Sequence, residues 1–258
     1  MTTESTLVTR PTRPLEAEKR AIVIGASSGI GAALAQELAQ QGYIVAALAP
    51  DEAGLKKTAE GGNGRIHTYL HDVTKYGEVP ALFQQIVHDL GGLDIVAYIA
   101  GVQPVVALDE YNFEKDAAMI EVNLLGAIAW LNQAAPRFER AKSGHILAVS
   151  SIAGDRGRVG APVYNTSKAG LSTYLEALRN RLAQHGITVT TIKFGFVNTA
   201  LLENAAKTFW VISPEKAAQE IHKAIQKKKQ TVYAPARWGL VSLIIRHIPS
   251  FIFRRMSF

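Results

Sequence analysis

A tyrosine and a lysine four residues apart are the first side chains in this sequence whose types and spacing could do chemistry. Tyr164 and Lys168 occur in the stretch PVYNTSKAG, and on a helix residues at i and i+4 share a face. A free tyrosine has a pKa of about 10, and a nearby positive charge favours the phenolate and lowers that pKa. Tyr164 would then be a usable acid or base near neutral pH. A half-buried tyrosine beside an unrelated, solvated lysine is the simpler alternative, so the surrounding elements must decide.

Six short apolar runs alternate with helical patterns along the chain. They occupy residues 21–24, 44–49, 94–100, 145–150, 188–193 and 231–234. Because these runs are apolar throughout rather than alternating, they indicate strands that are buried on both faces. Helices are predicted to end before Gly42 and Gly186, and another is predicted to begin at Ser213. This order predicts an α/β fold with a parallel sheet, right-handed crossovers and helices on both faces.

Three glycines gather where the first strand meets the first helix, in AIVIGASSGIG. Gly25, Gly29 and Gly31 would let the backbone turn tightly and approach a pyrophosphate, and the helix N-terminus offers unpaired N–H groups. A tight turn without a ligand is the alternative. The strand before the glycines and the amphipathic helix after them favour dinucleotide binding.

The composition limits the classes of protein. With 258 residues, 48% hydrophobic and 19% charged, a single globular domain is expected. The absence of cysteine excludes disulfides, cysteine metal sites and thiol catalysis, and it suits a cytoplasmic protein. No metal site is predicted. Residues 1–19 have no secretory signal and are predicted to be a mobile extension, which leaves residues 20–235 as the domain and 236–258 as a tail.

The positive charge is concentrated near the C-terminus. The chain has a formal net charge of +6, and the segment from Ile221 onward holds eight basic and no acidic residues, so the rest of the chain carries −2. This distribution indicates a local anionic partner and argues against a nucleic-acid-binding protein.

With these elements in place, the sequence resembles the short-chain dehydrogenase/reductase family from about residue 20 to residue 234. The stretches that carry the resemblance are GASSGIG, HDVT, AGV, EVNLLG, SSIAG and YNTSK. Ser151 precedes Tyr164 by thirteen residues, which is the family spacing. The resemblance implies a single-domain, Rossmann-type doubly wound sheet and an NAD(P)-dependent enzyme that interconverts a secondary alcohol and a ketone.

The resemblance also implies roles for four catalytic residues. Tyr164 would exchange a proton with the substrate oxygen, and Lys168 would lower the pKa of that tyrosine and hold the nicotinamide ribose. Ser151 would hydrogen-bond the substrate oxygen, and Asn123 would anchor a water molecule that links Lys168 to solvent. The plain alternatives are a capped strand end for Ser151 and a helix irregularity for Asn123.

Cofactor contacts are implied for a larger set of residues, which follow the strand ends. They are Gly25, Ser27, Ser28, Gly29, Ile30, Gly31, Asp51, Asp72, Val73, Ala100, Gly101, Tyr164, Lys168, Val197 and Thr199. The choice between NAD(H) and NADP(H) stays open, because Ala49 and Pro50 stand where an acid or an arginine usually selects the cofactor, and Asp51 is a displaced candidate.

Four further departures from the family pattern fall at positions that mostly brace the cofactor loops. They are Ile24, Tyr98, Ile99 and Phe194. We expect them to change cofactor affinity and geometry more than the chemistry.

Three short stretches resemble a narrower subgroup, the reductases of a polyprenyl-phosphate-linked keto-pentose. They lie at residues 49–51, 154–168 and 246–255. This likeness implies a bulky apolar or lipid-linked substrate. Arg156 and Arg158 would then edge the substrate mouth and recognise a phosphate, for which the forked arginine side chain is suited. A solvated loop is the alternative.

The C-terminal tail combines apolar and basic residues. It is rich in Leu, Ile and Phe, but Arg246, His247 and Pro249 interrupt it, so it lacks the roughly 20 apolar residues that span a bilayer. We expect peripheral contact with the inner face of the cell membrane, aided by Arg254 and Arg255. Folding of the tail over the substrate cleft or a subunit interface is the alternative.

Partners and rival functions complete the expectations. Residues 121–141 and 164–184 form helical patterns that are apolar on more than one face, and the resemblance implies a homodimer or homotetramer built on them. The rival functions are a non-catalytic dinucleotide-binding regulator or scaffold of the same fold, and a sugar-nucleotide epimerase or dehydratase. The complete Asn-Ser-Tyr-Lys set argues against the first, and the short sequence after Lys193 argues against the second.

Overall fold

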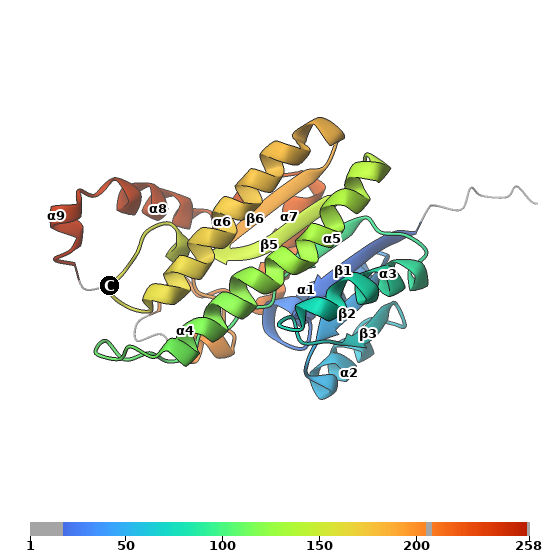
Figure 1. Cartoon of the computed structure of the whole chain (residues 1–258), viewed down its shortest axis with the longest axis horizontal. Helices are drawn as coiled ribbons and strands as arrows, with labels where there is room; N and C mark the ends of the chain where they lie inside the picture. Colours follow the sequence, from blue (N-terminus) through green and yellow to red (C-terminus); the bar gives the residue numbers. More distant parts are fainter. Residues whose placement is uncertain (1–17, 205–207, 257–258) are drawn as a thin grey trace, which may run out of the picture.

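Seven parallel strands form one sheet in the order β3-β2-β1-β4-β5-β6-β7 (Figure 1). The computed structural model that shows this sheet describes residues 18–204 and 208–256. The strands are β1 (Lys19–Ile24), β2 (Tyr43–Ala49), β3 (Ile66–Leu70), β4 (Ile95–Tyr98), β5 (His145–Ser151), β6 (Thr188–Phe194) and β7 (Thr231–Ala234). The predicted doubly wound parallel sheet is confirmed.

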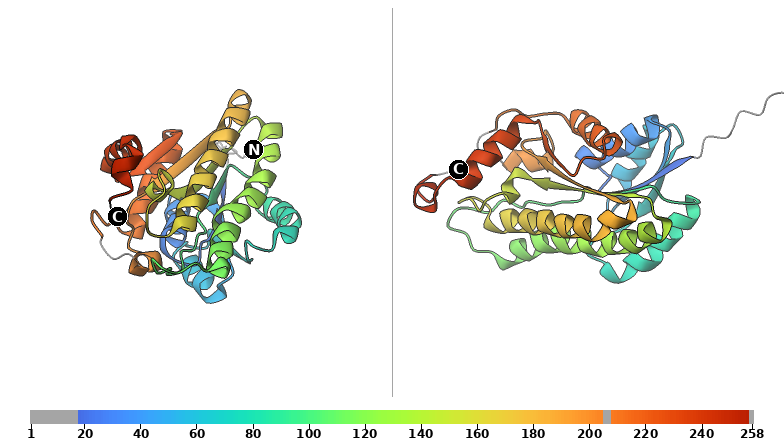
Figure 2. Two further views of the ribbon diagram at one scale, coloured as in Figure 1. Left: turned by 60° about the vertical axis from the view of Figure 1, so that its left-hand side comes forward. Right: turned by 90° about the horizontal axis from the view of Figure 1, so that it is seen from above.

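Helices cover both faces of this sheet, as Figure 2 shows from two directions. The α-helices are α1 (Gly29–Gln40), α2 (Glu52–Glu60), α3 (Val79–Asp89), α4 (Phe113–Ile120), α5 (Gly126–Ala141), α6 (Pro162–Leu182), α7 (Pro214–Gln226), α8 (Arg237–His247) and α9 (Ser250–Phe253). The shorter helices are η1 (Tyr76–Glu78), η2 (Glu121–Leu125), η3 (Ile152–Gly154), η4 (Ala183–His185) and η5 (Ala200–Asn204). One core lies under α1, α2 and α7, and the other lies under α3, α5 and α6.

The strands are apolar at consecutive positions because both of their faces are covered. In β1, Ala21 and Val23 belong to the core under α1, whereas Ile22 and Ile24 belong to the core on the opposite face. Successive side chains of a strand point to opposite faces, so a doubly covered strand needs an apolar residue everywhere. This explains why strands such as β1 and β5 could be predicted from apolar runs.

The seventh strand, β3, was missed by the sequence analysis. It is an edge strand that pairs only with β2, and of its five residues only Ile66 is buried. His67, Thr68 and Leu70 are exposed, so the segment shows no continuous apolar run. The prediction of six strands was wrong by this one.

The predicted helix ends are confirmed, with their physical signals. α1 stops two residues before Gly42, and the turn after α6 ends at Gly186; both glycines have positive φ, 87° and 76°. The Ser213 hydroxyl accepts from the Lys216 N–H at 3.2 Å and so caps α7.

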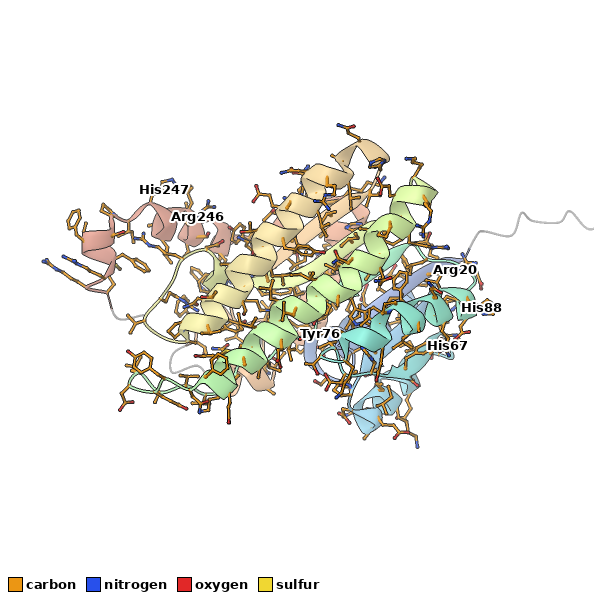
Figure 3. All side chains as sticks on the ribbon, viewed as in Figure 1. Arg20, His67, Tyr76, His88, Arg246 and His247 are labelled. Carbon is orange, nitrogen blue, oxygen red and sulfur yellow. The ribbon has the colours of Figure 1, made fainter. Side chains whose placement is uncertain are left out.

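The carboxyl ends of the strands and the C-terminal helices lie at the same end of the molecule (Figure 1). In Figure 3, Arg246 and His247 of α8 mark this end, and Arg20 at the start of β1 lies at the opposite end. The strand order reverses at β1, with β2 on one side and β4 on the other, which is where open α/β sheets bind ligands.

The sheet begins within the first twenty residues of the chain. The predicted extension, residues 1–19, falls outside the described residues except at its end, where β1 begins at Lys19. In the part of the chain that the structure describes, no helix combines the length and the hydropathy needed to cross a bilayer. The domain boundaries at residues 20 and 235 stay predictions.

Candidate active site

Four buried polar side chains meet near the carboxyl ends of β4 and β5. Asn123 lies in η2, Ser151 ends β5, and Tyr164 and Lys168 lie one turn apart on α6. Each is at most 9% exposed, although such side chains are mostly exposed in folded proteins unless they have partners. The fold therefore brings together the four residues that the sequence analysis named as catalytic.

Ser151 contacts the phenol from the end of β5. Its Oγ accepts from the Ala153 N–H at 3.1 Å, lies 3.4 Å from the Phe194 carbonyl oxygen, and hydrogen-bonds with Tyr164. The capped strand end, which was the plain alternative for Ser151, is thus present together with the contact to the phenol. Tyr164 also packs in an apolar cluster with Met119 and Ala153.

The Tyr164 phenol is protonated at neutral pH in the protein alone. Burial raises its pKa, while hydrogen bonding with Ser151 and the charge of Arg158 oppose that rise without cancelling it. The Lys168 Nζ lies 5.8 Å from the Tyr164 ring centroid. The Lys168 side chain is directed past the ring toward the sheet, and the expectation that it lowers the pKa of Tyr164 stays a prediction.

Lys168 is a buried cation held against β5. Its Nζ donates to the Val149 carbonyl at 3.0 Å, and burial lowers its pKa to about 8. A Cβ added at Gly101 would lie 3.3 Å from both Lys168 Nζ and Asn123 Oδ1. The turn after β4, the helix that carries Asn123 and the ammonium group therefore converge at one point.

A π-helical turn positions Asn123. The Oδ1 atom of Asn123 accepts from the Val102 N–H at 2.7 Å, and Nδ2 donates to the Val102 carbonyl at 3.0 Å and to Ser167 Oγ at 3.1 Å. The helix irregularity that was the plain alternative is thus present, and such π-bulges are frequent at functional sites. The amide group of Asn123 ties the turn after β4 to α6.

Tyr98 supports the same π-helical turn from the end of β4. Its buried hydroxyl donates to the Val122 carbonyl at 2.5 Å, and a Cβ at Gly126 would lie 2.5 Å from that hydroxyl. Sequence reasoning treated Tyr98 only as a departure from the family pattern. The contact between residues 98 and 126 could have been predicted from the pairing of a tyrosine at 98 with a glycine at 126.

The glycine-rich loop leaves space for an anion at the start of α1. Gly25 has a φ of 90° and lies against Ala100, where a Cβ would come within 2.5 Å of the backbone nitrogen. A Cβ at Gly31 would lie 1.9 Å from the Gly25 carbonyl oxygen. The Ser28 side chain does not cap α1, and the first turn holds no acidic residue. The helix N-terminus is thus open to a phosphate, and these residues fit the pyrophosphate of a dinucleotide.

Three other predicted cofactor residues lie around this loop. A Cβ at Gly54 would lie 2.6 Å from the Ser27 carbonyl oxygen and 2.5 Å from Asp51 Oδ2, so Ser27 and Asp51 are neighbours. Asp51 also caps α2 by accepting from the Gly54 N–H at 3.1 Å. The Thr199 methyl group lies 3.0 Å from where a Cβ of Gly29 would be. Two loops that are far apart in the sequence therefore meet at the glycines.

The remaining predicted cofactor residues line the same edge of the sheet. Asp72 accepts from the backbone N–H and the hydroxyl of Thr74 at 2.9 and 2.8 Å, and the backbone bond lowers the pKa of its carboxyl. Val73 is buried, Val197 forms a bridge with Ile212, and Ile30 packs on the core under α1. Their positions are compatible with the predicted contacts, which stay predictions.

Arg158 is near enough to Tyr164 to affect the pKa of the phenol. Its charge lowers the pKa of Tyr164, and one of its terminal nitrogens donates to Asn165 Oδ1 at 3.3 Å. Its Nε is buried and has no hydrogen-bond partner among the described residues. The sequence analysis placed Arg158 at the substrate mouth, and the structure adds the electrostatic effect on the phenol.

Arg156 has a different environment from the one the sequence suggested. Its guanidinium donates to the carbonyls of Ile245, at 2.7 Å, and Ile248, and its centre lies 3.9 Å from the ring centroid of Phe253. All of these partners belong to the C-terminal tail. The donors that were expected to meet a substrate phosphate instead hold the tail against the loop after β5.

An aromatic cluster that the sequence analysis did not anticipate lies beside the end of β6. Phe196, Phe209, Trp210 and Trp238 have ring centroids 5.1 to 5.8 Å apart. Trp238, the second residue of α8, is 2% exposed. The sequence signal for this cluster was a pair of aromatic residues on each side of residues 197–208, Phe194 and Phe196 before them and Phe209 and Trp210 after them. This segment follows the end of β6.

Comparisons with known proteins agree with this architecture. The model of the short chain dehydrogenase family matches residues 19–210. An uncharacterized oxidoreductase of Staphylococcus saprophyticus is 35% identical over 188 residues, which cover 71% of this chain and 80% of that protein. One of Myxococcus xanthus is 35% identical over 211 residues, 81% of each chain. One of Mycobacterium tuberculosis is 27% identical over 246 residues, 93% of this chain and 97% of that protein.

A solved structure shares the fold. ElxO with NADP bound has a TM-score of 0.76 and 20% sequence identity, and the match covers 85% of this chain and 98% of that chain. At this identity the likeness concerns the fold, whereas the family match spans most of the chain and includes the glycine loop, Asn123, Ser151, Tyr164 and Lys168. The chain therefore belongs to the short-chain dehydrogenase family and is an oxidoreductase that uses NAD(H) or NADP(H).

Proposed function

We propose that this oxidoreductase interconverts a secondary alcohol and a ketone, with Tyr164 as general acid and base. The observation that carries the proposal is the buried phenol, which hydrogen-bonds with Ser151 beside the buried cation Lys168 and the half-buried Arg158. The nicotinamide cofactor supplies or accepts the hydride when it is bound. Every other step depends on this chain's own side chains.

In reduction, the Ser151 hydroxyl would hydrogen-bond the carbonyl oxygen, and Tyr164 would give that oxygen its proton. Because burial raises the pKa of Tyr164, the phenol holds this proton at neutral pH and is ready to donate it. In oxidation, the phenolate must form first, so a higher pH favours it. Arg158 stabilises the phenolate that remains after proton transfer, and Lys168 would hold the ribose.

The proposed substrate is a bulky apolar or lipid-linked alcohol or ketone. Support comes from the aromatic cluster of Phe196, Phe209, Trp210 and Trp238 beside the end of β6. The relatives described above carry names that specify no substrate, so the likeness to keto-pentose reductases stays a prediction. We also propose a cytoplasmic enzyme at the inner face of the cell membrane.

A non-catalytic dinucleotide-binding regulator is the alternative function. Such a protein would gain nothing from a buried lysine whose pKa is lowered to about 8, because burying this charge opposes folding. The costly ammonium next to a buried phenol favours the enzyme.

The test is single-turnover hydride transfer with Tyr164→Phe, followed by cofactor absorbance, together with a cofactor titration. We expect hydride transfer to slow by at least about a thousandfold, because the proton donor is lost, while cofactor affinity stays within about threefold. Tyr174→Phe on the same helix is the matched control, because the Tyr174 hydroxyl bonds Asn132 and not the site. Wild-type hydride transfer by Tyr164→Phe would contradict the mechanism.

A further inference from the structure

The helix α8 exposes its leucine and isoleucine side chains and directs a polar side chain toward the protein, the opposite of a usual amphipathic surface helix. Its outward residues Leu240, Leu243 and Ile244 are 64%, 56% and 57% exposed, at the i, i+3, i+4 spacing of one helix face. The inward residues are Trp238 and the polar Ser242, which are 2% and 3% exposed. A helix that only met water would place its leucines inward.

Polar contacts fix this orientation. The Ser242 hydroxyl donates to Asp155 Oδ2 at 2.5 Å, and the Tyr233 hydroxyl donates to the same atom at 3.1 Å. Lys193 pairs with the other oxygen of Asp155. The carboxylate is therefore surrounded by donors from β6, β7 and α8, and α8 cannot roll to bury its leucines without breaking these bonds.

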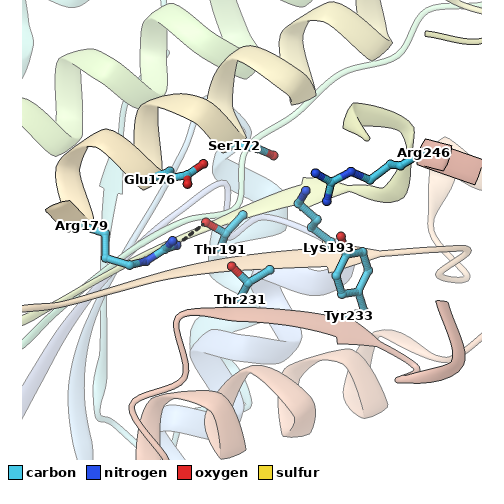
Figure 4. A pocket seen from close by; sticks show the side chains of 8 residues that line it. All are labelled: Ser172, Glu176, Arg179, Thr191, Lys193, Thr231, Tyr233 and Arg246. Carbon is cyan, nitrogen blue, oxygen red and sulfur yellow. Dashed lines mark hydrogen bonds between the residues drawn. The ribbon is translucent and has the colours of Figure 1, made fainter. Parts of the chain in front are cut away.

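The space on the inner side of α8 is polar as well. A cavity of about 240 Å³ lies between α6, β6, β7 and α8, and charged side chains line it, including Glu176, Arg179, Lys193 and Arg246. Figure 4 shows Arg246 reaching from α8 toward Lys193. The part of α8 that faces this cavity is therefore opposite polar groups rather than an apolar surface.

The short helix α9 continues the same apolar and basic character. Phe251 and Ile252 are 60% and 45% exposed, and Arg254 and Arg255 next to them are exposed. No acidic residue occurs from Ile221 to the end of the sequence. Nothing in this segment opposes an anionic partner.

A second exposed apolar segment lies at the same end of the molecule. Val105, Leu108, Tyr111 and Phe113, in and after the turn that follows β4, are exposed, and Figures 1 and 2 show this segment and α9 at the end where β5 leads into α6. Asp109 is also exposed there. Electrostatic attraction must therefore come from the α8–α9 side.

From these observations we infer that α8 and α9 form a docking surface for an anionic lipid bilayer. The outward face of α8, with Phe251 and Ile252, would enter the interface, and Arg254 and Arg255 would meet the phosphates of the headgroups. Because Arg156 ties this tail to the loop between Ser151 and Tyr164, docking holds the substrate mouth at the lipid surface. The inference rests on the proposed function only for the lipid-borne substrate.

The experiment is flotation of the full-length chain with vesicles of pure phosphatidylcholine and with vesicles that contain about 30 mol % phosphatidylglycerol. We expect the protein to float with the anionic vesicles and to bind them at least about tenfold more tightly than the neutral ones. A second copy of the chain is the rival occupant of this surface. If a second copy covers this surface, the molecular mass in solution rises with protein concentration and falls when the α8 face is substituted, and the protein does not float with vesicles. This result would overturn the inference.

Two variants and two matched controls locate the surface. Leu240→Gln/Leu243→Gln/Ile244→Gln removes the apolar face, and Arg254→Gln/Arg255→Gln removes the charge; each should weaken binding to anionic vesicles by about tenfold or more. The controls are Leu70→Gln, a leucine exposed to 62% on β3, and Lys56→Gln/Lys57→Gln on α2, both at the opposite edge of the sheet. Controls that weaken binding as much as the variants would contradict the assignment.

Flotation needs no turnover, so this test and the test of the function can fail separately. Tyr164→Phe should float as the wild type does. An inactive wild-type protein that floats would leave the docking surface standing, and an active protein that stays with the unbound fraction on anionic vesicles would refute it.

Discussion

At the scale of single residues, the ammonium of Lys168 lies in a setting that disfavours its charge. Burial lowers its pKa from 10.5 to about 8, and its hydrogen bond goes to a backbone carbonyl rather than to a carboxylate. The folded protein therefore binds this proton less tightly than the unfolded chain. Below about pH 8 the charge is present in both states, and its burial opposes folding.

We predict that Lys168→Met stabilises the protein while it removes activity. At pH 7 the free energy of unfolding should rise by roughly 1 to 3 kcal/mol. The substitution removes the unfavourable burial of a charge, and this gain is larger than the stabilisation lost with the hydrogen bond to Val149. As pH rises from 8 toward 10.5, the wild type loses the penalty, so the difference should shrink. Urea unfolding at pH 7 and pH 9.5 measures both effects. A destabilised variant at pH 7 would show that Lys168 has a partner that offsets its burial.

Arg158 should set the pH dependence of the chemistry. Its charge lowers the pKa of Tyr164, so Arg158→Gln should raise that pKa further and move the rise of alcohol oxidation to higher pH. If the pKa of Tyr164 rose by about one, the phenolate fraction and the oxidation rate at neutral pH would fall by about tenfold. The pH profile of kcat/KM measures this, with Arg181→Gln, an exposed arginine of the last turn of α6, as the control. Identical profiles for Arg158→Gln and wild type would exclude the coupling.

The sequence pointed to these candidate residues but not to their electrostatics. The motif spacing pointed to Asn123, Ser151, Tyr164 and Lys168, which the fold brings together. The direction of the phenol pKa could not be predicted, because it depends on how deeply the ring is buried and on Arg158, whose distance from the ring is set by a loop without regular structure.

At the scale of elements, the π-helical turn η2 depends on a contact between Tyr98 and Gly126. The tyrosine hydroxyl donates to the Val122 carbonyl, and the glycine leaves room for it. Removal of the hydroxyl removes this hydrogen bond to the Val122 carbonyl, and addition of a methyl group at 126 creates a clash.

We therefore predict coupled effects of Tyr98→Phe and Gly126→Ala. Tyr98→Phe should cost about 1 to 3 kcal/mol of stability and lower kcat more than it raises KM, since Asn123 adjoins the freed carbonyl. Gly126→Ala should cost more, because its Cβ would lie 2.5 Å from the Tyr98 hydroxyl. The double variant should lose less than the sum of the two, because the clashing atom is gone. Additive losses in thermal unfolding would argue against the contact.

The elements differ in how far the sequence predicted them. β1 and β5 are covered on both faces, and their apolar runs were sufficient. β3 lies at the edge and only Ile66 among its residues is buried, so no continuous apolar run marks it. The π-helical turn in residues 121–125 was foreseen only as an irregularity, because it arises from hydrogen bonds that Asn123 makes with Val102 and Ser167, which are far from it in the sequence.

At the scale of the whole molecule, self-association through α5 and α6 stays a prediction. These two helices lie side by side over one face of the sheet, linked at 2.9 Å by Tyr174 and Asn132. A pair of such helices can meet its copy across a two-fold axis. We expect a dimer or tetramer by light scattering at micromolar concentration, and Tyr174→Glu should dissociate it. A monomer at all concentrations would contradict this expectation.

The opposite positions of β1's first residue and of α9 have a practical consequence for handling the enzyme. Lys19 begins the sheet at one end of the molecule, and α9 lies at the other (Figure 1), where Phe253 contacts Arg156 of the loop that would edge the substrate mouth. If the enzyme is captured on a sensor surface through a tag fused after α9, the surface would cover the mouth. If the tag is fused before Lys19, the mouth would stay open to solution. The two immobilised formats should therefore agree for small ketones and differ for long-chain ones.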